Sequence, residues 1–201
     1  MLIFTPWWGS QKKVLTRPHF VRYLSRDMKP LLLRDWQGCN PKGWLMSEKL
    51  DGWRMMWDGE RFITRQNEVL DAPAWFLAGM PAFPLDGELF AGRGEFNRIQ
   101  GLISAGWHGL TFRVFDAPCH LGAFAKRAAF LRTIELPAHA SVVEQVVCRG
   151  EQHLIEFADA IVEAGGEGAV IRDPKAKHVA GRTWSVQRWV PQNPAINRRS
   201  A

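Results

Sequence analysis

The chain has 201 residues, of which 46% are hydrophobic and 23% charged, and its formal net charge is +6. These proportions are typical of globular proteins and exclude a disordered or fibrous chain, while the length suits one domain. The three cysteines have no disulfide or zinc-binding spacing, and no apolar run approaches the length of a membrane span. We therefore expect a cytoplasmic protein with no signal peptide and no membrane partner.

The charge is unevenly distributed along the chain. Residues 1–48 hold eight Lys/Arg against three Asp/Glu, a balance of +5, and residues 172–201 hold seven against one, a balance of +6. Residues 49–171 hold eleven against sixteen, a balance of −5. Two basic ends around an acidic centre fit a polyanionic partner that is bound from outside, with metal or proton chemistry inside. A merely solvated surface is the alternative for either end.

In chain order, four prolines divide residues 1–42, which predicts an arm with one short helix near His19–Arg26. After this arm, apolar patterning and turn residues predict both strands and helices. The predicted strands are residues 43–49, 53–58, 61–66, 83–90, 110–118, 141–149, 167–173 and 184–190. The predicted helices are residues 72–79, 95–105, 122–134 and 151–165. The Asp58-Gly59 pair predicts a hairpin turn between the second and third strands.

The predicted strands outnumber the predicted helices, and several neighbouring strands are joined by turns. This pattern favours an α+β fold with largely antiparallel sheets flanked by helices, and disfavours a doubly wound fold. We expect a basic N-terminal arm over residues 1–29, followed by one domain over residues 30–201.

Four short segments carry residues suited to chemistry. SEKLDGWR places Lys49 just before a tight glycine, where it is either a solvated strand-end charge paired with an aspartate or a nucleophile. LDGELF places Asp86 and Glu88 two residues apart, so that both project from one face of a strand. FRVFDAP presents Phe115, and GGEGAVIRDP presents Glu167 between glycines at the start of an apolar strand.

Together with TRQNEVLDAPAWF, and in this order, these segments resemble the nucleotidyltransferase motifs of ATP-dependent DNA ligases, a superfamily shared with RNA ligases and mRNA capping enzymes. The similarity extends over about residues 30–191 and is to the minimal bacterial and phage ligases of the E type. It implies a nucleotidyltransferase (adenylation) domain of the DNA ligase or ATP-grasp-like type. It also implies ATP and Mg²⁺ as cofactors, and nicked double-stranded DNA as the partner of a DNA ligase.

The resemblance implies a role for each matched residue. Lys49 would attack the α-phosphate of ATP to form lysyl-AMP, and the AMP would then pass to the 5′-phosphate of a nick, where a 3′-hydroxyl displaces it. Glu88 would bind the ribose, Phe115 would stack on adenine, and Glu167 would bind the metal. The implied nucleotide-binding residues are Glu48, Lys49, Leu50, Arg54, Arg65, Glu88, Phe115, Glu167 and Arg188, with Glu167 and Glu88 as metal ligands. The implied DNA-binding residues are Arg65, Lys175, Lys177, Arg182, Arg198 and Arg199.

The sequence departs from the family pattern in two respects. The family has two lysines two residues apart on a late strand, whereas this chain has Arg188 and Val190, of which only the first keeps the charge. The family also continues into an OB-fold domain, which we do not expect here, so the basic ends or a partner protein would complete a monomeric enzyme. The alternatives are an RNA ligase or other nucleotidyltransferase, and a nick-binding protein that has lost turnover.

Overall fold

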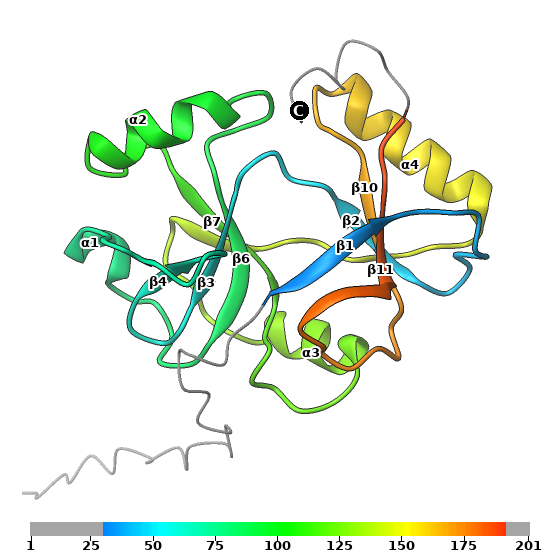
Figure 1. Cartoon of the computed structure of the whole chain (residues 1–201), viewed down its shortest axis with the longest axis horizontal. Coiled ribbons are helices and arrows are strands. Elements are labelled where there is room, and N and C mark those ends of the chain that lie inside the picture. The colour runs from blue at the N-terminus through cyan, green and yellow to red at the C-terminus, as the bar shows by residue number, and fades with distance from the viewer. Residues whose placement is uncertain (1–29, 192–201) are drawn as a thin grey trace, which may run out of the picture.

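The computed structural model describes residues 30–191, which form two β-sheets side by side with helices around them (Figure 1). The first sheet has the order β1 (Leu31–Asp35), β11 (Gly181–Trp189), β10 (Ala169–Arg172), β2 (Leu45–Glu48) and β9 (Val146–Val147). The second has the order β5 (Val69–Leu70), β4 (Phe62–Thr64), β3 (Trp53–Trp57), β6 (Leu85–Phe90), β7 (Thr111–Asp116) and β8 (Ala140–Val142). The helices are α1 (Ala74–Leu77), α2 (Ile99–Ser104) with the preceding 3-10 turn η2 (Phe96–Arg98), α3 (Phe124–Leu131) and α4 (Glu151–Glu163).

The strand pairings confirm the predicted α+β class with largely antiparallel sheets. Within residues 30–191, only the β1–β11 and β7–β8 pairs are parallel, and β1 and β8 are edge strands. The other pairings are antiparallel, and short turns join β3 to β4 and β4 to β5, as antiparallel pairing allows.

Strand β1 corrects the prediction that residues 1–42 form only an arm and a helix. Its apolar LLLRD segment pairs with β11, and Leu31 is buried. Prolines interrupt strands when they fall inside them, but Pro30 and Pro41 stand outside this one. The predicted arm over residues 1–29 and its helix near His19–Arg26 lie outside the described residues.

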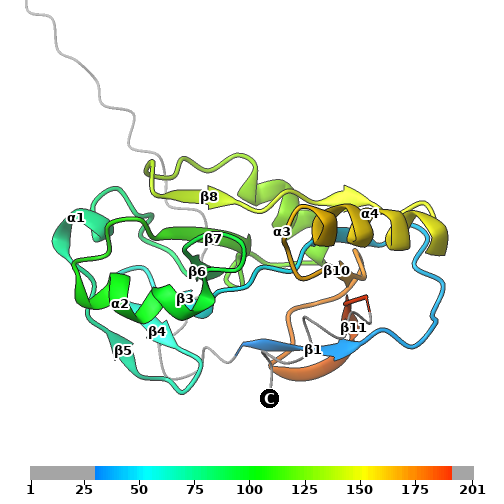
Figure 2. The ribbon, with the colours of Figure 1, turned by 90° about the horizontal axis from the view of Figure 1, so that it is seen from above.

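The single strand predicted over residues 141–149 is also wrong, because this segment passes from one sheet to the other. Its first part forms β8 and its last part forms β9, and Figure 2 shows the connection running along both sheets. The Val143 amide donates to the Val114 carbonyl at 2.7 Å, and the Cys148 amide donates to the Trp44 carbonyl at 2.8 Å. A β-branched run indicates extended backbone but does not indicate which sheet the backbone joins.

Each sheet packs on its own apolar core. Phe62, fully buried in β4, contacts the rings of Trp57, Phe76, Trp107 and Phe112 in the core beside the second sheet.

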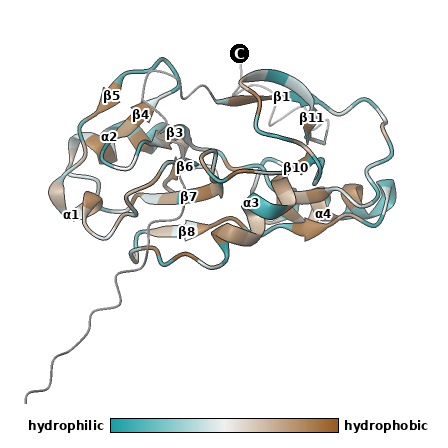
Figure 3. Cartoon of the chain, turned by 90° about the horizontal axis from the view of Figure 1, so that it is seen from below, coloured by the Kyte–Doolittle hydropathy of each residue, from teal (hydrophilic) through white to brown (hydrophobic). Residues whose placement is uncertain are grey.

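Helix α4 covers the first sheet and illustrates the helical pattern that the sequence predicts. Its buried residues Leu154, Ala158 and Ile161 follow a spacing of four and three residues, which places them on one face. The hydrophobic and hydrophilic colours along α4 in Figure 3 reflect this amphipathic pattern. None of the helices in residues 30–191 is long and apolar enough to cross a membrane.

Candidate active site

Residues of both sheets line a pocket of about 290 Å³. Its size lies near the lower end of the range for small-molecule sites. The pocket wall includes these residues predicted from the sequence: Glu48, Lys49, Leu50, Arg54, Arg65, Glu88, Phe115, Arg182 and Arg188. Residues far apart along the chain are thus gathered around one cavity.

Lys49 directly follows β2, where its backbone amide donates to the Gly168 carbonyl at 2.9 Å. Its ammonium group forms an ion pair with the Glu167 carboxylate, which places Glu167 at the pocket although it is not in the wall itself. Burial lowers the pKa of Lys49 below its ordinary value, and the charge of Arg188 lowers it further, against the opposing effect of Glu88. A lowered pKa increases the fraction of neutral amine, which is the nucleophilic form.

Glu88 projects into the same pocket from β6. Its carboxylate accepts a hydrogen bond from the Gly52 amide at 2.9 Å, which connects it to the segment that follows Lys49. Burial raises the pKa of Glu88 to about 7, although the positive charges of Arg54 and Lys49 act in the opposite direction. Near neutral pH this carboxyl group therefore exists in both protonation states.

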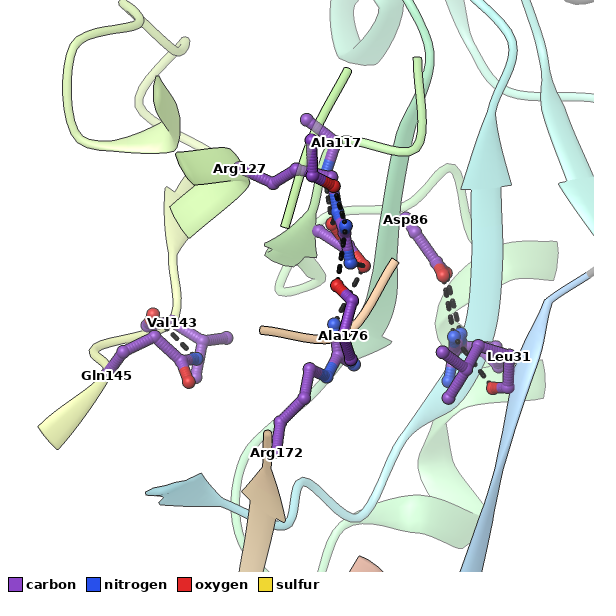
Figure 4. Close-up of polar contacts among 11 residues, drawn as sticks. Leu31, Asp86, Ala117, Arg127, Val143, Gln145, Arg172 and Ala176 are labelled. Carbon is purple, nitrogen blue, oxygen red and sulfur yellow. Dashed lines mark hydrogen bonds and ion pairs between the residues drawn. The ribbon is translucent and has the colours of Figure 1, made fainter. Parts of the chain in front are cut away.

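Arg54 is held by Asp86 and covers Phe115. Its Nε and Nη2 atoms donate to the two Asp86 oxygens at 2.6 Å each, and Nη2 also reaches the Leu31 carbonyl at 3.4 Å (Figure 4). The guanidinium carbon lies 4.5 Å from the centre of the Phe115 ring. This bidentate pair fixes the guanidinium group in the pocket wall, and within residues 30–191 its third nitrogen, Nη1, makes no hydrogen bond.

Behind the wall lies a charged cluster that sequence reasoning did not find. The fully buried Asp116 carboxylate accepts hydrogen bonds from Arg127 at 2.7 and 3.1 Å and from Arg172 at 2.7 Å (Figure 4). Burial disfavours this carboxylate, but Arg172 and Arg127 outweigh that effect and keep the pKa of Asp116 below its ordinary value. Arg172 lines the pocket and stacks on Phe124, with 4.2 Å from its guanidinium carbon to the ring centre. In the sequence, Asp116 follows Phe115 in FRVFDAP and Arg172 stands in VIRDP, but neither motif indicates that these two side chains form a pair.

Two other predicted residues already have partners. The Glu48 carboxylate is bound by Arg93, a residue that sequence reasoning also missed. Arg188 is exposed, and its Nε donates to Asp35 at 2.6 Å while its side chain reaches the pocket. Val190, where the family has a second lysine, brings no charge.

The predicted DNA-binding residues are only partly at the pocket. Arg65 and Arg182 are exposed and line it, whereas Lys175 and Lys177 are exposed on the connection between β10 and β11, outside the pocket wall. Arg182 also donates to the Leu33 carbonyl at 3.2 Å. Residues 198 and 199, both arginines, lie outside the described residues.

The carboxylates at the pocket suit a magnesium ion that is also bound by phosphate oxygens. Residues 30–191 contain no group of three or more His, Cys, Asp or Glu side chains arranged to hold a metal. Mg²⁺ commonly uses only one or two carboxylates together with phosphate oxygens and waters. Glu88 and Glu167, which both act on Lys49, meet that requirement.

The two sheets and the lysine-containing pocket between them define a nucleotidyltransferase domain of the kind found in ATP-dependent ligases. The chain is 36% identical over 160 residues to a DNA ligase of Haemophilus influenzae. This aligned region covers 76% of this chain and 60% of that relative. A solved Lig E DNA ligase, from a structure–function study titled "DNA binding with a minimal scaffold", has a TM-score of 0.75 at 31% identity. That match covers 81% of this chain and 68% of the other.

The chain belongs to the ATP-dependent DNA ligase family and is similar to its minimal E type. The Chlorella virus DNA ligase–adenylate, with a TM-score of 0.66 and 19% identity over 81% of this chain and 68% of that chain, shares the fold. No family model matches the chain. The chain spans 60% of the length of the Haemophilus influenzae relative.

Proposed function

We propose that this chain is the adenylation domain of a DNA ligase that uses ATP and Mg²⁺ to seal nicks in double-stranded DNA. The observation that carries the proposal is Lys49, half-buried in a pocket of about 290 Å³ beside Glu88 and Glu167. Family membership supports the same reaction.

The first step would take place at the Lys49 amine. After Nζ loses a proton, it attacks the α-phosphorus of ATP, the bond from this phosphorus to the bridging oxygen breaks, and pyrophosphate leaves. Burial and the nearby Arg188 favour the neutral amine that this attack requires. The AMP would then pass to a 5′-phosphate of DNA, and attack by the adjacent 3′-hydroxyl would release it.

The surrounding residues would position the nucleotide. Phe115 offers an aromatic face for adenine, Glu88 an acceptor for a ribose hydroxyl, and Arg54 and Arg65 donors for ribose or phosphate oxygens. The bound Mg²⁺, held by Glu167 and Glu88, would supply positive charge against the phosphates.

Self-labelling with ATP tests this proposal directly. The wild-type chain, incubated with α-³²P-ATP and Mg²⁺, is expected to carry label on a denaturing gel, and Lys49→Ala is expected to abolish it. Lys126→Ala, which removes an exposed lysine outside the pocket, serves as the matched control and should label normally. Label that survives in a folded Lys49→Ala protein would refute the assignment of the nucleophile.

The same assay separates the proposed ligase from a nick-binding protein without turnover. A chain without turnover would not label, whereas a ligase labels and then transfers AMP to a nicked duplex. Parallel substrates with DNA or RNA at the nick identify the polynucleotide that is sealed.

We also propose a monomeric, cytoplasmic enzyme. Its three cysteines, Cys39, Cys119 and Cys148, are free thiols in the structure, which suits a reducing compartment.

A further inference from the structure

Arg93 reaches from one sheet to the other beside the pocket. It lies on the glycine-flanked connection between β6 and η2. Its Nε and Nη2 atoms donate to the two Glu48 oxygens at 2.7 and 3.0 Å. The remaining nitrogen, Nη1, donates to the carbonyl of Ala164 at 3.2 Å, just beyond the end of α4. One guanidinium group thus joins the end of β2 to the end of α4.

Both contacts of Arg93 lie close in the sequence to residues with an expected role, namely the nucleophile Lys49 and the metal ligand Glu167. Glu48 immediately precedes Lys49, and Ala164 begins the short turn that leads to Glu167. A Cβ atom at Gly166 would lie 3.0 Å from a Glu48 oxygen, so glycine in this turn gives the carboxylate room. Arg93 therefore holds the two segments that supply the Lys49–Glu167 ion pair.

Arg93 also affects the charge of the pocket. Glu48 lines the pocket with Glu88, and Glu167 lies beside them. The triphosphate of ATP is itself strongly negative, so an unpaired Glu48 carboxylate would add repulsion where phosphates must bind. A bidentate arginine pair neutralises this charge and fixes the direction of the carboxylate.

We propose that Arg93 is a positioning residue for self-adenylation, which acts by neutralising Glu48 and holding its carboxylate away from the nucleotide phosphates. This inference rests on the proposed function. Arg93 is partly exposed, with 36% of its side-chain surface accessible, so its replacement is expected to leave the fold intact.

The first test measures, in variants of this connection, how the single-turnover rate of self-adenylation depends on ATP concentration; KM here is the half-saturating ATP concentration and kcat is the maximal rate. Arg93→Ala is expected to raise the KM for ATP about fivefold or more, with a smaller change in kcat, because repulsion weakens binding more than the chemical step. Arg93→Lys keeps the charge without the bidentate geometry and should fall between wild type and Arg93→Ala. Arg98→Ala removes a more exposed arginine that pairs with Glu95 nearby, and it should leave the KM unchanged.

A rescue experiment distinguishes neutralisation from a merely structural role. In the Arg93→Ala background, Glu48→Gln removes the unpaired charge and is expected to return the KM for ATP close to the wild-type value. If Arg93 served only to brace the two segments, the second substitution would leave the KM high or raise it further. A KM that fails to recover, or one that Arg93→Ala does not change, overturns the proposal.

The wild-type measurement keeps this inference separate from the proposed function. Without wild-type self-labelling, the proposed function itself fails. With wild-type labelling and loss in Lys49→Ala, the function stands and the Arg93 variants decide the inference alone. Circular dichroism and thermal melting of each variant verify folding, and Arg93→Lys decides the KM comparison if Arg93→Ala does not fold.

Discussion

At the scale of single residues, burial changes the acid–base behaviour of the pocket. The pKa of Lys49 falls and that of Glu88 rises to about 7, in each case mainly because burial disfavours the charged form. Lys49 is thereby brought closer to the neutral amine that adenylation needs. Glu88 can act as a hydrogen-bond donor or an acceptor near neutral pH, according to its protonation state.

The raised pKa of Glu88 predicts a pH-dependent stability. Between its ordinary pKa of 4.5 and its folded value of about 7, the folded state binds more protons than the unfolded state, so the free energy of unfolding falls as the pH rises. The glutamine side chain in Glu88→Gln cannot ionise, so this variant does not lose free energy of unfolding at position 88 as the pH rises. We expect Glu88→Gln to gain stability relative to wild type by about 1–3 kcal/mol from pH 4.5 to 8.

Urea unfolding of both proteins, in EDTA and without nucleotide, measures this difference across the pH range. Asp173→Asn, which changes a carboxylate on the connection outside the pocket wall, is the control and should show no such trend. Parallel stability curves for wild type and Glu88→Gln would contradict the raised pKa.

At the scale of elements, β6 combines Glu88, a carboxylate that lines the pocket, with close packing against β7. The register between these strands shifts at Asp86 and Gly87. A Cβ atom at Gly87 would lie 2.6 Å from the Arg113 carbonyl oxygen and 2.7 Å from the Phe112 ring. The absence of a side chain at this position therefore allows the two strands to approach, and it maintains the direction in which Glu88 points.

We predict that Gly87→Ala destabilises the protein by about 1–3 kcal/mol, because backbone and a buried ring must move to admit the methyl group. Gly101→Ala is the matched control, since a Cβ atom there meets no neighbour within 4 Å and the residue lies in α2. That substitution should stabilise by about 0.5–1 kcal/mol. Thermal unfolding of the two variants measures both effects, and a Gly87→Ala protein as stable as wild type would show that β6 tolerates the added group.

At the scale of the whole molecule, the connection between β10 and β11 carries positive charge next to the pocket. Its exposed Lys175 and Lys177 lie outside the pocket wall. Ala176 stands between these two lysines, and its carbonyl accepts hydrogen bonds from Arg127 at 3.2 Å and from the Phe124 amide at 2.8 Å. The connection is thus held against α3, and we propose that its lysines contact DNA phosphates.

Replacement of Lys175 and Lys177 by alanine should weaken binding to a nicked duplex and flatten its salt dependence. Each lost phosphate contact reduces the slope of log K against log salt by about 0.9, so the expected change approaches 2. Self-adenylation should be unaffected, because neither side chain lines the pocket. Arg132→Ala with Arg149→Ala removes the same charge from exposed positions elsewhere and controls for net charge. An unchanged slope in the lysine variant, or an equal change in the control, would place the DNA contacts elsewhere.

Local pattern was enough to predict the α+β class and most elements, and the resemblance of the motifs to a known family supplied nine of the residues that line the pocket, although not Arg172. The residues within SEKLDGWR and within LDGELF are close in the sequence. Their relative positions are therefore set by local backbone conformation and do not depend on how the sheets pack. Helix α4 and strand β6 were predictable for the same reason, because their periodicities follow from their own residues.

Only the tertiary structure decided which distant residues meet. Glu48 and Arg93 are 45 residues apart, and Asp116 and Arg172 are 56 apart. Such pairings depend on how two sheets pack, not on local conformational preference. The split of residues 141–149 between β8 and β9 has the same origin, because an extended segment joins whichever sheet edge the surrounding packing leaves unpaired. The residues expected to react were therefore recognisable in short motifs, whereas the contacts that orient them depend on long-range packing.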